Sequence, residues 1–296
     1  GLSAWSLIPQ LADIDNIWEQ VRSASGPWAA VAIALSMVTY VAATAALLGA
    51  IPVRLRYWPA LIAQLASSFA NRVTPARVGG LATNVRYLQR KGVQAAVSVT
   101  AVGVNAVAGL IVHLLLTLGF LLLSGGQEGS DGLAVPSPRL VAVATAITVA
   151  VLLGSIAVPL SRRLLLSQVL PQLRAGWDSI RSIGRDPGRL VLLFGGSAVI
   201  TLAYLGAMMA SLQAFGSTAS FPVVGLLFLT GSVVANAAPT PGGLGATEAA
   251  LIAALGLVEE SAIVIPAVFL YRFVTFWLPI LPGWAAMTYL QRTDQL

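Results

Sequence analysis

The chain lacks the residue types on which most metal and redox sites depend. It contains no cysteine and one histidine, His113, in 296 residues. These absences exclude disulfides, iron–sulfur clusters, thiolate metal sites and a histidine-rich metal site within the chain. The sequence also lacks a phosphate-binding loop of the Walker type and any plausible Ser/His/Asp arrangement. We therefore expect no metal, no cofactor, and no hydrolytic or transfer chemistry in this chain.

Charged residues are also scarce, at 9% of the chain against roughly 25% in soluble proteins. Hydrophobic residues make up 57%, and several apolar runs approach or exceed the ~20 residues that a helix needs to cross a bilayer. Because these runs are continuously apolar and do not alternate, they predict helices and not a membrane β-barrel. We expect an all-α polytopic membrane protein. Its net charge of +6 is then explained by arginines beside anionic lipid, and no nucleic-acid partner is expected.

The apolar runs predict five full spans, at residues 28–51, 93–123, 140–160, 190–215 and 262–290. The stretch 1–27 is too polar to cross and is typical of an amphipathic interfacial helix. We expect a first repeat at 28–123 and a second at 190–296. Between them, residues 124–189 hold an outer loop, a linker span and an arginine-rich cytoplasmic segment.

One short motif occurs twice. Thr74-Pro75-Ala76-Arg77-Val78-Gly79 recurs as Thr240-Pro241-Gly242-Gly243-Leu244-Gly245, and each copy follows an asparagine, Asn71 or Asn236. Each copy interrupts an apolar segment with residues that break helices. In membrane proteins, Gly/Pro-interrupted apolar segments at matching positions of two halves are typical of transport sites. The repeat therefore predicts a site built from both copies.

The charges assign the two faces of the membrane. Basic residues flank the first broken segment on both sides, and six arginines lie in residues 161–189. By the positive-inside rule, both regions are cytoplasmic. The acidic loop 124–138 and the acids before the last span are then outside, as is the N-terminal segment, while the C-terminus is inside. This pattern predicts two re-entrant helical hairpins that enter from opposite faces, in an inverted-topology repeat.

Each break also creates the N-terminus of a half-helix, which favours anions. Glu248 lies in the first turn of the second half-helix, as a capping residue or as a protonatable or cation-binding group facing the cavity. Arg272 lies within the last span, as an ion-pair partner of Glu248, a phosphate contact, or both. Arg72 and Arg77 contact substrate or reach the interface. His113 is expected to pack with a hydrogen-bonded ring in preference to relaying protons.

Asn105, on the span after the first broken segment, either bonds between helices or contacts substrate. The candidate substrate-binding residues are Arg72, Thr74, Pro75, Arg77, Gly79, Gly80, Asn105, Asn236, Thr240, Pro241, Gly242, Gly243, Gly245, Glu248 and Arg272. No residue is a catalytic candidate.

The second motif, Pro241-Gly242-Gly243-Leu244-Gly245-Ala246-Thr247-Glu248, followed by Tyr271-Arg272, resembles the lysylphosphatidylglycerol synthase transmembrane family. The first motif, continued by Arg86-Tyr87-Leu88, extends the resemblance over nearly the whole chain. The resemblance implies a flippase-like domain that moves phospholipid or lipid-linked head groups between leaflets. It also implies roles in that site for the glycine motif, Glu248 and Arg272. The chain departs from the family pattern at Leu81, where members often carry an acid, and at Asn105, where they often carry an arginine.

We therefore expect a lipid flippase in a bacterial cytoplasmic membrane, with an anionic lipid or lipid-linked precursor as its partner. Two alternatives remain open from the sequence. The chain could be the membrane half of a lipid-modifying enzyme whose catalytic domain lies elsewhere, or a membrane scaffold. Because the sequence begins at Gly1, we expect it to be part of a longer polypeptide. A homo-oligomer is also left open.

Overall fold

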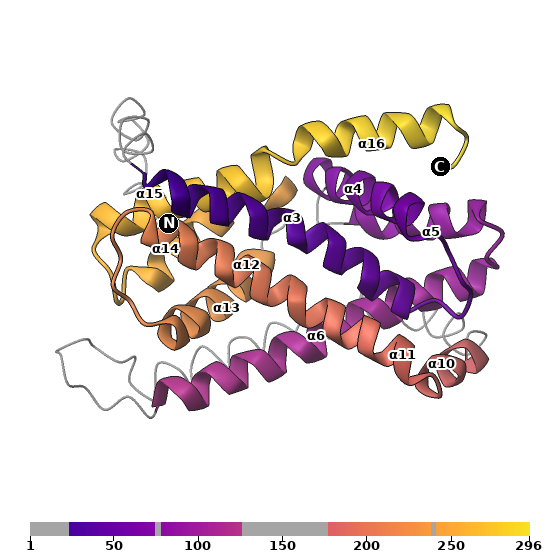
Figure 1. The fold of residues 1–296 in the computed structure, drawn as a ribbon, viewed down its shortest axis with the longest axis horizontal. Helices are drawn as coiled ribbons and strands as arrows, with labels where there is room; N and C mark the ends of the chain where they lie inside the picture. The colour runs from indigo at the N-terminus through magenta and orange to yellow at the C-terminus, as the bar shows by residue number, and fades with distance from the viewer. Residues whose placement is uncertain (1–23, 75–77, 126–176, 238–240) are drawn as a thin grey trace.

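The computed structural model describes residues 24–74, 78–125, 177–237 and 241–296, in which every regular element is a helix and none is a strand (Figure 1). The expected linker span at 140–160 and most of the amphipathic segment lie outside these residues. The α-helices are α3 (Gly26–Gly49), α4 (Tyr57–Val73), α5 (Val78–Arg90), α6 (Ala95–Gly125), α10 (Trp177–Gly184), α11 (Pro187–Leu190), α12 (Gly196–Gln213), α13 (Phe221–Ala237), α14 (Ala246–Leu255), α15 (Ser261–Arg272) and α16 (Ile280–Arg292). Three short elements adjoin them, the π-helices η3 (Val191–Gly195) and η5 (Phe273–Trp277) and the 3₁₀-helix η4 (Pro241–Gly243).

Four helical segments in the described ranges are long and apolar enough to cross a membrane: Gly26–Gly49, Ala95–Ser124, Pro187–Gln213 and Ser261–Arg292. They correspond to four of the five spans predicted from the sequence. Large apolar side chains remain exposed along them, among them Leu115, Leu122, Val191 and Leu281. A soluble protein rarely leaves so much apolar surface in contact with water. The protein is therefore a membrane protein with several apolar helices.

Helices α3 and α12 lie side by side and cross closely (Figure 1). A Cβ atom added to Gly196 of α12 would lie 2.7 Å from the backbone nitrogen of Ala46, and one added to Gly49 would lie 2.5 Å from that of Leu193 in η3, which leads into α12. Small residues permit such close approach between apolar helices, where dispersion contacts provide most of the attraction. The crossing fixes the relative positions of two helices that both reach the site described below.

The two broken segments form helix pairs, α4 with α5 and α13 with α14. Helix α4 also packs along α16, and α13 packs against α6. The two pairs meet because α4 contacts η4, the turn of the second break. The short helices that the sequence predicted on each side of both breaks are therefore present, and the breaks lie next to each other in space.

The sequence predicted one continuous span at residues 262–290. In the structure this span is interrupted and is not a single α-helix. The π-helix η5 joins α15 to α16, and the N–H of Leu278, the residue that follows it, donates to the carbonyl oxygen of Phe273 at 2.8 Å. Pro279 follows and has no N–H to donate. The carbonyl groups four and five residues before it, those of Thr275 and Val274, therefore receive no hydrogen bond from this position. This kink supplies acceptors to the interior of the protein.

Candidate functional site

A buried ion pair joins the second half-helix to the last span. Nε of Arg272, the final residue of α15, donates to Oε1 of Glu248 at 2.6 Å, and the two side chains are only 7% and 16% exposed. Glu248 lies in the first turn of α14, where the helix dipole favours a carboxylate. The ion pair expected from the sequence is thus present. The attraction between two buried charges offsets the cost of removing them from water only when the geometry is good. Removing either partner would leave the other charge buried without compensation.

Arg72 binds two carbonyl groups at the kink in the last span, one of which, that of Thr275, receives no hydrogen bond from Pro279. Its Nε donates to the carbonyl oxygen of Phe276 at 2.8 Å, and its Nη2 donates to that of Thr275 at 2.9 Å. Oγ of Ser36, on α3, donates to the preceding carbonyl oxygen, that of Val274, at 2.8 Å. Polar backbone at membrane depth is tolerated where protein groups satisfy it. The π-helix is therefore stabilised by side chains from the first half of the chain.

Two further hydrogen bonds complete the surroundings of Arg72. Its Nη2 also donates to the hydroxyl of Tyr40 at 3.0 Å, and its Nη1 donates to Oγ of Ser68. The guanidinium group thus bonds through all three nitrogens, and it lies at the inner end of α4. Of the roles expected for Arg72, reaching the membrane interface does not match this position.

The phenyl ring of Phe276 connects the two arginines. The guanidinium carbon of Arg272 lies 4.3 Å from the ring centroid and that of Arg72 lies 5.5 Å from it, both within the range of cation–π attraction. Gly242 packs against the same ring, since a Cβ atom there would lie 2.5 Å from it. Gly242 also has φ 61°, a conformation that glycine adopts without strain. Both breaks and the kinked span therefore meet at Phe276.

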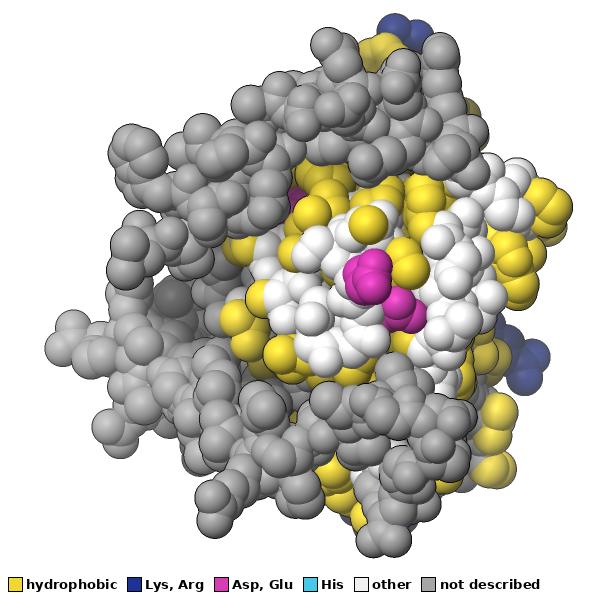
Figure 2. All heavy atoms as spheres, turned by 90° about the vertical axis from the view of Figure 1, so that its left-hand side faces the viewer, with side chains coloured by type: hydrophobic (Ala, Val, Ile, Leu, Met, Phe, Trp, Pro, Cys, Tyr) yellow, Lys and Arg dark blue, Asp and Glu magenta, His cyan; other side chains and the backbone are white. Residues whose placement is uncertain are grey.

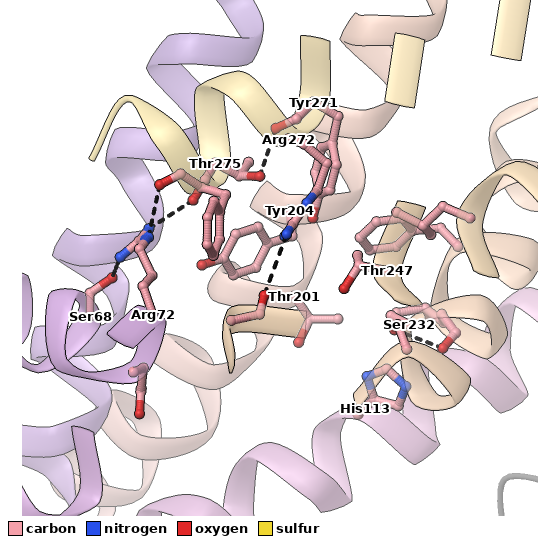
Figure 3. A pocket seen from close by; sticks show the side chains of 17 residues that line it. Ser68, Arg72, His113, Thr201, Tyr204, Ser232, Thr247, Tyr271, Arg272 and Thr275 are labelled. Carbon is pink, nitrogen blue, oxygen red and sulfur yellow. Dashed lines mark hydrogen bonds between the residues drawn. The ribbon is translucent and has the colours of Figure 1, made fainter. Parts of the chain in front are cut away.

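A cavity of about 260 Å³ opens beside this junction. Figure 3 shows its polar side chains around a common space, with Ser68 and Arg72 on one side and Ser232 and His113 on the other. Helices from both halves contribute to its wall. The lining residues are Ser68, Asn71, Arg72, His113, Thr201, Tyr204, Phe228, Leu229, Ser232, Ala235, Gly242, Thr247, Leu251, Tyr271, Arg272, Thr275 and Phe276.

Side chains from the end of α4 cap the N-terminus of α5. At the start of α5, the N–H of Gly80 donates to Oδ1 of Asn71 at 2.8 Å and that of Gly79 donates to Oγ1 of Thr74 at 3.0 Å. Side chains from the end of α4 therefore already satisfy these donors. The N-cap of α14, Gly245, provides no side-chain hydrogen bond. The residues at the matching positions of the second motif, Asn236 and Thr240, have side chains outside the described part of the chain, and Thr247 of α14 lies on the cavity wall.

No group of three His, Cys, Asp or Glu residues in the described ranges is arranged to hold a metal ion. Comparison with known proteins places the chain more specifically. The family model described as the lysylphosphatidylglycerol synthase TM region matches residues 1–283. The chain belongs to this family. A search among curated proteins gave no significant match.

The lysylphosphatidylglycerol synthase TM region thus covers both breaks, the ion pair and the whole cavity wall. Membership indicates a lipid-related function in the membrane. Of the residues predicted from the sequence, Arg72, Gly242 and Arg272 line the cavity, and Glu248 supports Arg272.

The other predicted residues lie around this centre or outside the described part of the chain. Thr74, Gly79 and Gly80 form the capped start of α5, and Gly243 and Gly245 adopt φ 68° and 78° in the second turn. Asn105, on α6, is not among the lining residues, and its buried Oδ1 has no hydrogen-bond partner in the described structure. Pro75, Arg77 and Thr240 lie outside the described residues, as do the side chains of Asn236 and Pro241.

The cavity also contains polar residues that the sequence analysis did not select. Ser68 lies on α4, Thr201 and Tyr204 lie on α12, and Ser232 lies on α13. Thr201 and Tyr204 are three residues apart and therefore share one face of an otherwise apolar helix. That spacing could have identified the two residues as candidates for a polar site. Thr247 lies in the second motif, one residue before Glu248, and was not selected as a candidate although it lines the cavity.

Proposed function

We propose that this chain moves the head group of an anionic phospholipid, or of a lipid-linked precursor, between the two leaflets of a bacterial cytoplasmic membrane. The observation that carries the proposal is the polar, arginine-containing cavity at the junction of the two helix breaks. Ionisable residues within membrane segments are expensive to bury and usually mark a transport path. Membership of a lipid-related membrane family supports the same conclusion.

The size of the cavity supports a head group as its occupant. A volume of about 260 Å³ lies just below the roughly 300–1,000 Å³ of pockets that enclose drug-sized ligands. The acyl chains would therefore stay in the bilayer while the head group crosses. The Nη1 atom of Arg272 makes no hydrogen bond in the described structure, since its bonds use Nε and Nη2. Nη1 would contact the phosphate.

We also propose that the two helix pairs are re-entrant hairpins related by an inverted-topology repeat. Support comes from the separation of charge along the molecule. Arg90 of α5 pairs with Asp294 after α16, at 3.1 Å, and Lys91 donates to Gln295 at 2.7 Å. These residues lie at one end, near the label C in Figure 1. Figure 2 views the opposite end and has acidic side chains near its centre. Such an asymmetry favours a cytoplasmic C-terminus.

In this proposal the chain is a transporter and not an enzyme. The cavity brings hydroxyl groups and arginines together, and the carboxylate beside it, Glu248, is held by Arg272. The ion pair would open or turn when a phosphate group takes its place beside Arg272. When the site is empty, Glu248 would balance the charge of Arg272. After the phosphate leaves, Glu248 would form the ion pair with Arg272 again.

The test is lipid translocation in vesicles that contain the purified protein. We expect transport by the native chain and a loss of about tenfold or more, which is ~1.4 kcal/mol, in Glu248→Gln and in Arg272→Ala. Glu260→Gln and Arg292→Ala are matched controls, because both residues are exposed at helix ends. Gel filtration and thermal unfolding identify variants that do not fold. A native protein that moves no lipid contradicts the function, whereas folded site variants that transport at the native rate contradict the site.

A further inference from the structure

We propose that a groove between α5 and α16 binds an anionic phospholipid of the surrounding leaflet, with the lipid phosphate at Arg86 and an acyl chain along exposed apolar side chains beyond it. The groove contains a cavity of about 350 Å³, separate from the one described above. Its described lining residues are Ala82, Thr83, Arg86, Met287, Gln291 and Leu296. Lipid binding there does not depend on the proposed transport.

The two walls of the groove are held by α4. Helices α5 and α16 both pack against α4, and Figure 1 shows them on either side of it, near the label C. Oγ of Ser67, on α4, donates to the carbonyl oxygen of Gly80 on α5 at 2.9 Å. On the other side, a Cβ atom added to Gly283 of α16 would lie 3.0 Å from the carbonyl oxygen of Leu65. These close attachments fix both walls, so the groove is a built feature of the fold.

Residues 294–296 bound the groove at the charged end of the molecule. Arg90 pairs with Asp294 at 3.1 Å, and Nζ of Lys91 donates to Oε1 of Gln295 at 2.7 Å. Leu296 follows and lies on the cavity wall. The end of α16 is therefore tied to the turn after α5, and the polar part of the groove lies where lipid head groups are expected.

The charge around the groove favours an anionic ligand. Residues 86–91 and 284–296 contain four basic side chains and one acid, namely Arg86, Arg90, Lys91, Arg292 and Asp294. Arg86 is exposed on the cavity wall, so its guanidinium group can offer two parallel N–H donors to a phosphate. Gln291 adds an amide on the opposite wall. Basic pockets between membrane helices recognise lipid head groups with this chemistry.

Both walls continue from the cavity into exposed apolar side chains. Val78 lies four residues before Ala82, and Trp284 lies three residues before Met287, so each shares a helix face with a lining residue. Val78 is 53% exposed and Trp284 is 58% exposed. A polar end beside an apolar track matches the two parts of one phospholipid. A soluble phosphate compound would use only the end at Arg86.

Quenching of Trp284 by brominated acyl chains tests this site in vesicles that contain the full chain. Bromine quenches tryptophan fluorescence on contact, and the difference between native protein and Trp284→Phe isolates the signal of Trp284. Brominated phosphatidylglycerol is compared with brominated phosphatidylcholine, each as a minor component of an unbrominated bilayer. One arginine near the membrane surface favours an anionic lipid by about fivefold. We therefore expect phosphatidylglycerol to half-quench Trp284 at about a fifth of the mole fraction that phosphatidylcholine requires.

Substitutions at two arginines identify the residue that causes the preference. Arg86→Gln should remove it, and Arg86→Lys should keep part of it, because lysine retains the charge but not the paired donors. Arg292→Gln is the matched control, since Arg292 is exposed near the groove but does not line the cavity, and it should retain most of the preference. In detergent without lipid, Arg86→Gln should unfold at the native temperature. Equal quenching by the two lipids in native protein, or an undiminished preference in Arg86→Gln, would overturn the inference.

Two further measurements separate this site from the cavity at Arg272 and from a site for soluble phosphate. Glu248→Gln changes the central ion pair and should leave the preference at Trp284 intact. Loss of the preference in that folded variant would overturn a separate site. Glycerol phosphate at millimolar concentration and constant ionic strength should not reverse the quenching, and reversal would overturn the lipid as occupant. Native protein that shows the preference but moves no lipid contradicts the proposed function and leaves this inference standing.

Discussion

Arg72 and Phe276 are joined twice. Nε of Arg72 donates to the backbone carbonyl oxygen of Phe276 at 2.8 Å, and its guanidinium carbon lies 5.5 Å from the centroid of the Phe276 ring. The two residues come from different halves of the chain, one from the end of α4 and the other from the π-helix of the last span. The first break is therefore fixed to the second-half kink by side-chain to backbone hydrogen bonds. A movement of either one would have to break these bonds.

The first prediction concerns this connection. Arg72→Met removes the donors to the carbonyl groups of Thr275 and Phe276, and each unpaired buried acceptor costs about 1–3 kcal/mol. We therefore expect a clear fall in the melting temperature in detergent. Arg72→Lys keeps the charge but cannot reach both carbonyl groups and Ser68 at once, so it should lie between. Arg86→Met, an exposed arginine on α5, is the control. Equal melting temperatures for Arg72→Met and native protein would show that these hydrogen bonds do not hold the halves together.

The membrane-spanning helices and the two helix breaks were predictable from the sequence. Four spans follow from uninterrupted apolar runs, and both breaks follow from Thr-Pro and glycine residues that no continuous helix accommodates. The pairing of Glu248 with Arg272 was predictable too, because two buried opposite charges in an apolar region have few other partners.

The interior hydrogen bonds were not predictable in the same way. Pro279 indicates that the last span has unsatisfied carbonyl groups, but it does not identify the donor, which lies more than 200 positions earlier at Arg72. Thr201 and Tyr204 present a similar difficulty, since their role depends on the rotation of α12 about its axis. Close contacts between helices set that rotation, among them the contact of Gly196 of α12 with Ala42 and Ala46 of α3. Local sequence patterns contain little of this tertiary information.

The second prediction compares two glycines that both have positive φ. Gly242 has φ 61° and faces the ring of Phe276, whereas Gly216 has φ 83° and nothing within 4 Å of an added Cβ. Alanine at either position incurs about 1–2 kcal/mol of backbone strain. Only Gly242→Ala also displaces Phe276 from between the two arginines. We expect Gly242→Ala to reduce lipid translocation at least severalfold more than Gly216→Ala does, in variants compared at equal folded concentration. Similar transport rates in the two variants would argue against a role for the Phe276 junction.

A third prediction concerns the cytoplasmic end proposed for α12. The backbone N–H of Arg189, together with the guanidinium of Arg189 and the backbone N–H of Gly188, holds the pKa of Asp186 below its usual value of 3.8, and burial opposes this only in part. A lowered folded-state pKa stabilises the protein above the usual value, and this stabilisation is lost as the pH falls through the folded-state pKa. Asp186→Ala should therefore lower the melting temperature at neutral pH, and the difference from native protein should shrink below pH 3.8.

Asp186→Asn separates two contributions to this effect. Asparagine is as good an N-cap as aspartate, so this variant keeps the hydrogen bonds from the backbone but loses the charge that faces Arg189 at 3.0 Å. We expect a melting temperature between those of native protein and Asp186→Ala, with little dependence on pH in the acidic range. If the alanine variant shows the same melting temperature as native protein at every pH, the cap does not stabilise the start of this span.

The last prediction tests the close crossing of α3 and α12 with two adjacent glycines. Gly196 is buried, and an added Cβ would lie 2.7 Å from the backbone nitrogen of Ala46 and 2.8 Å from the carbonyl oxygen of Ala42. Backbone atoms cannot rotate away as a flexible side chain can, so Gly196→Ala must push the helices apart, at a cost of about 1–3 kcal/mol. Gly195 is exposed and has nothing within 4 Å, so Gly195→Ala should be neutral or stabilising by up to about 1 kcal/mol. Thermal unfolding of the two variants in one detergent measures the difference. Because the crossing also positions Thr201 and Tyr204, which line the cavity, Gly196→Ala should also reduce lipid translocation, whereas Gly195→Ala should not. If the two variants unfold at the same temperature, the helices are not in the close contact described here.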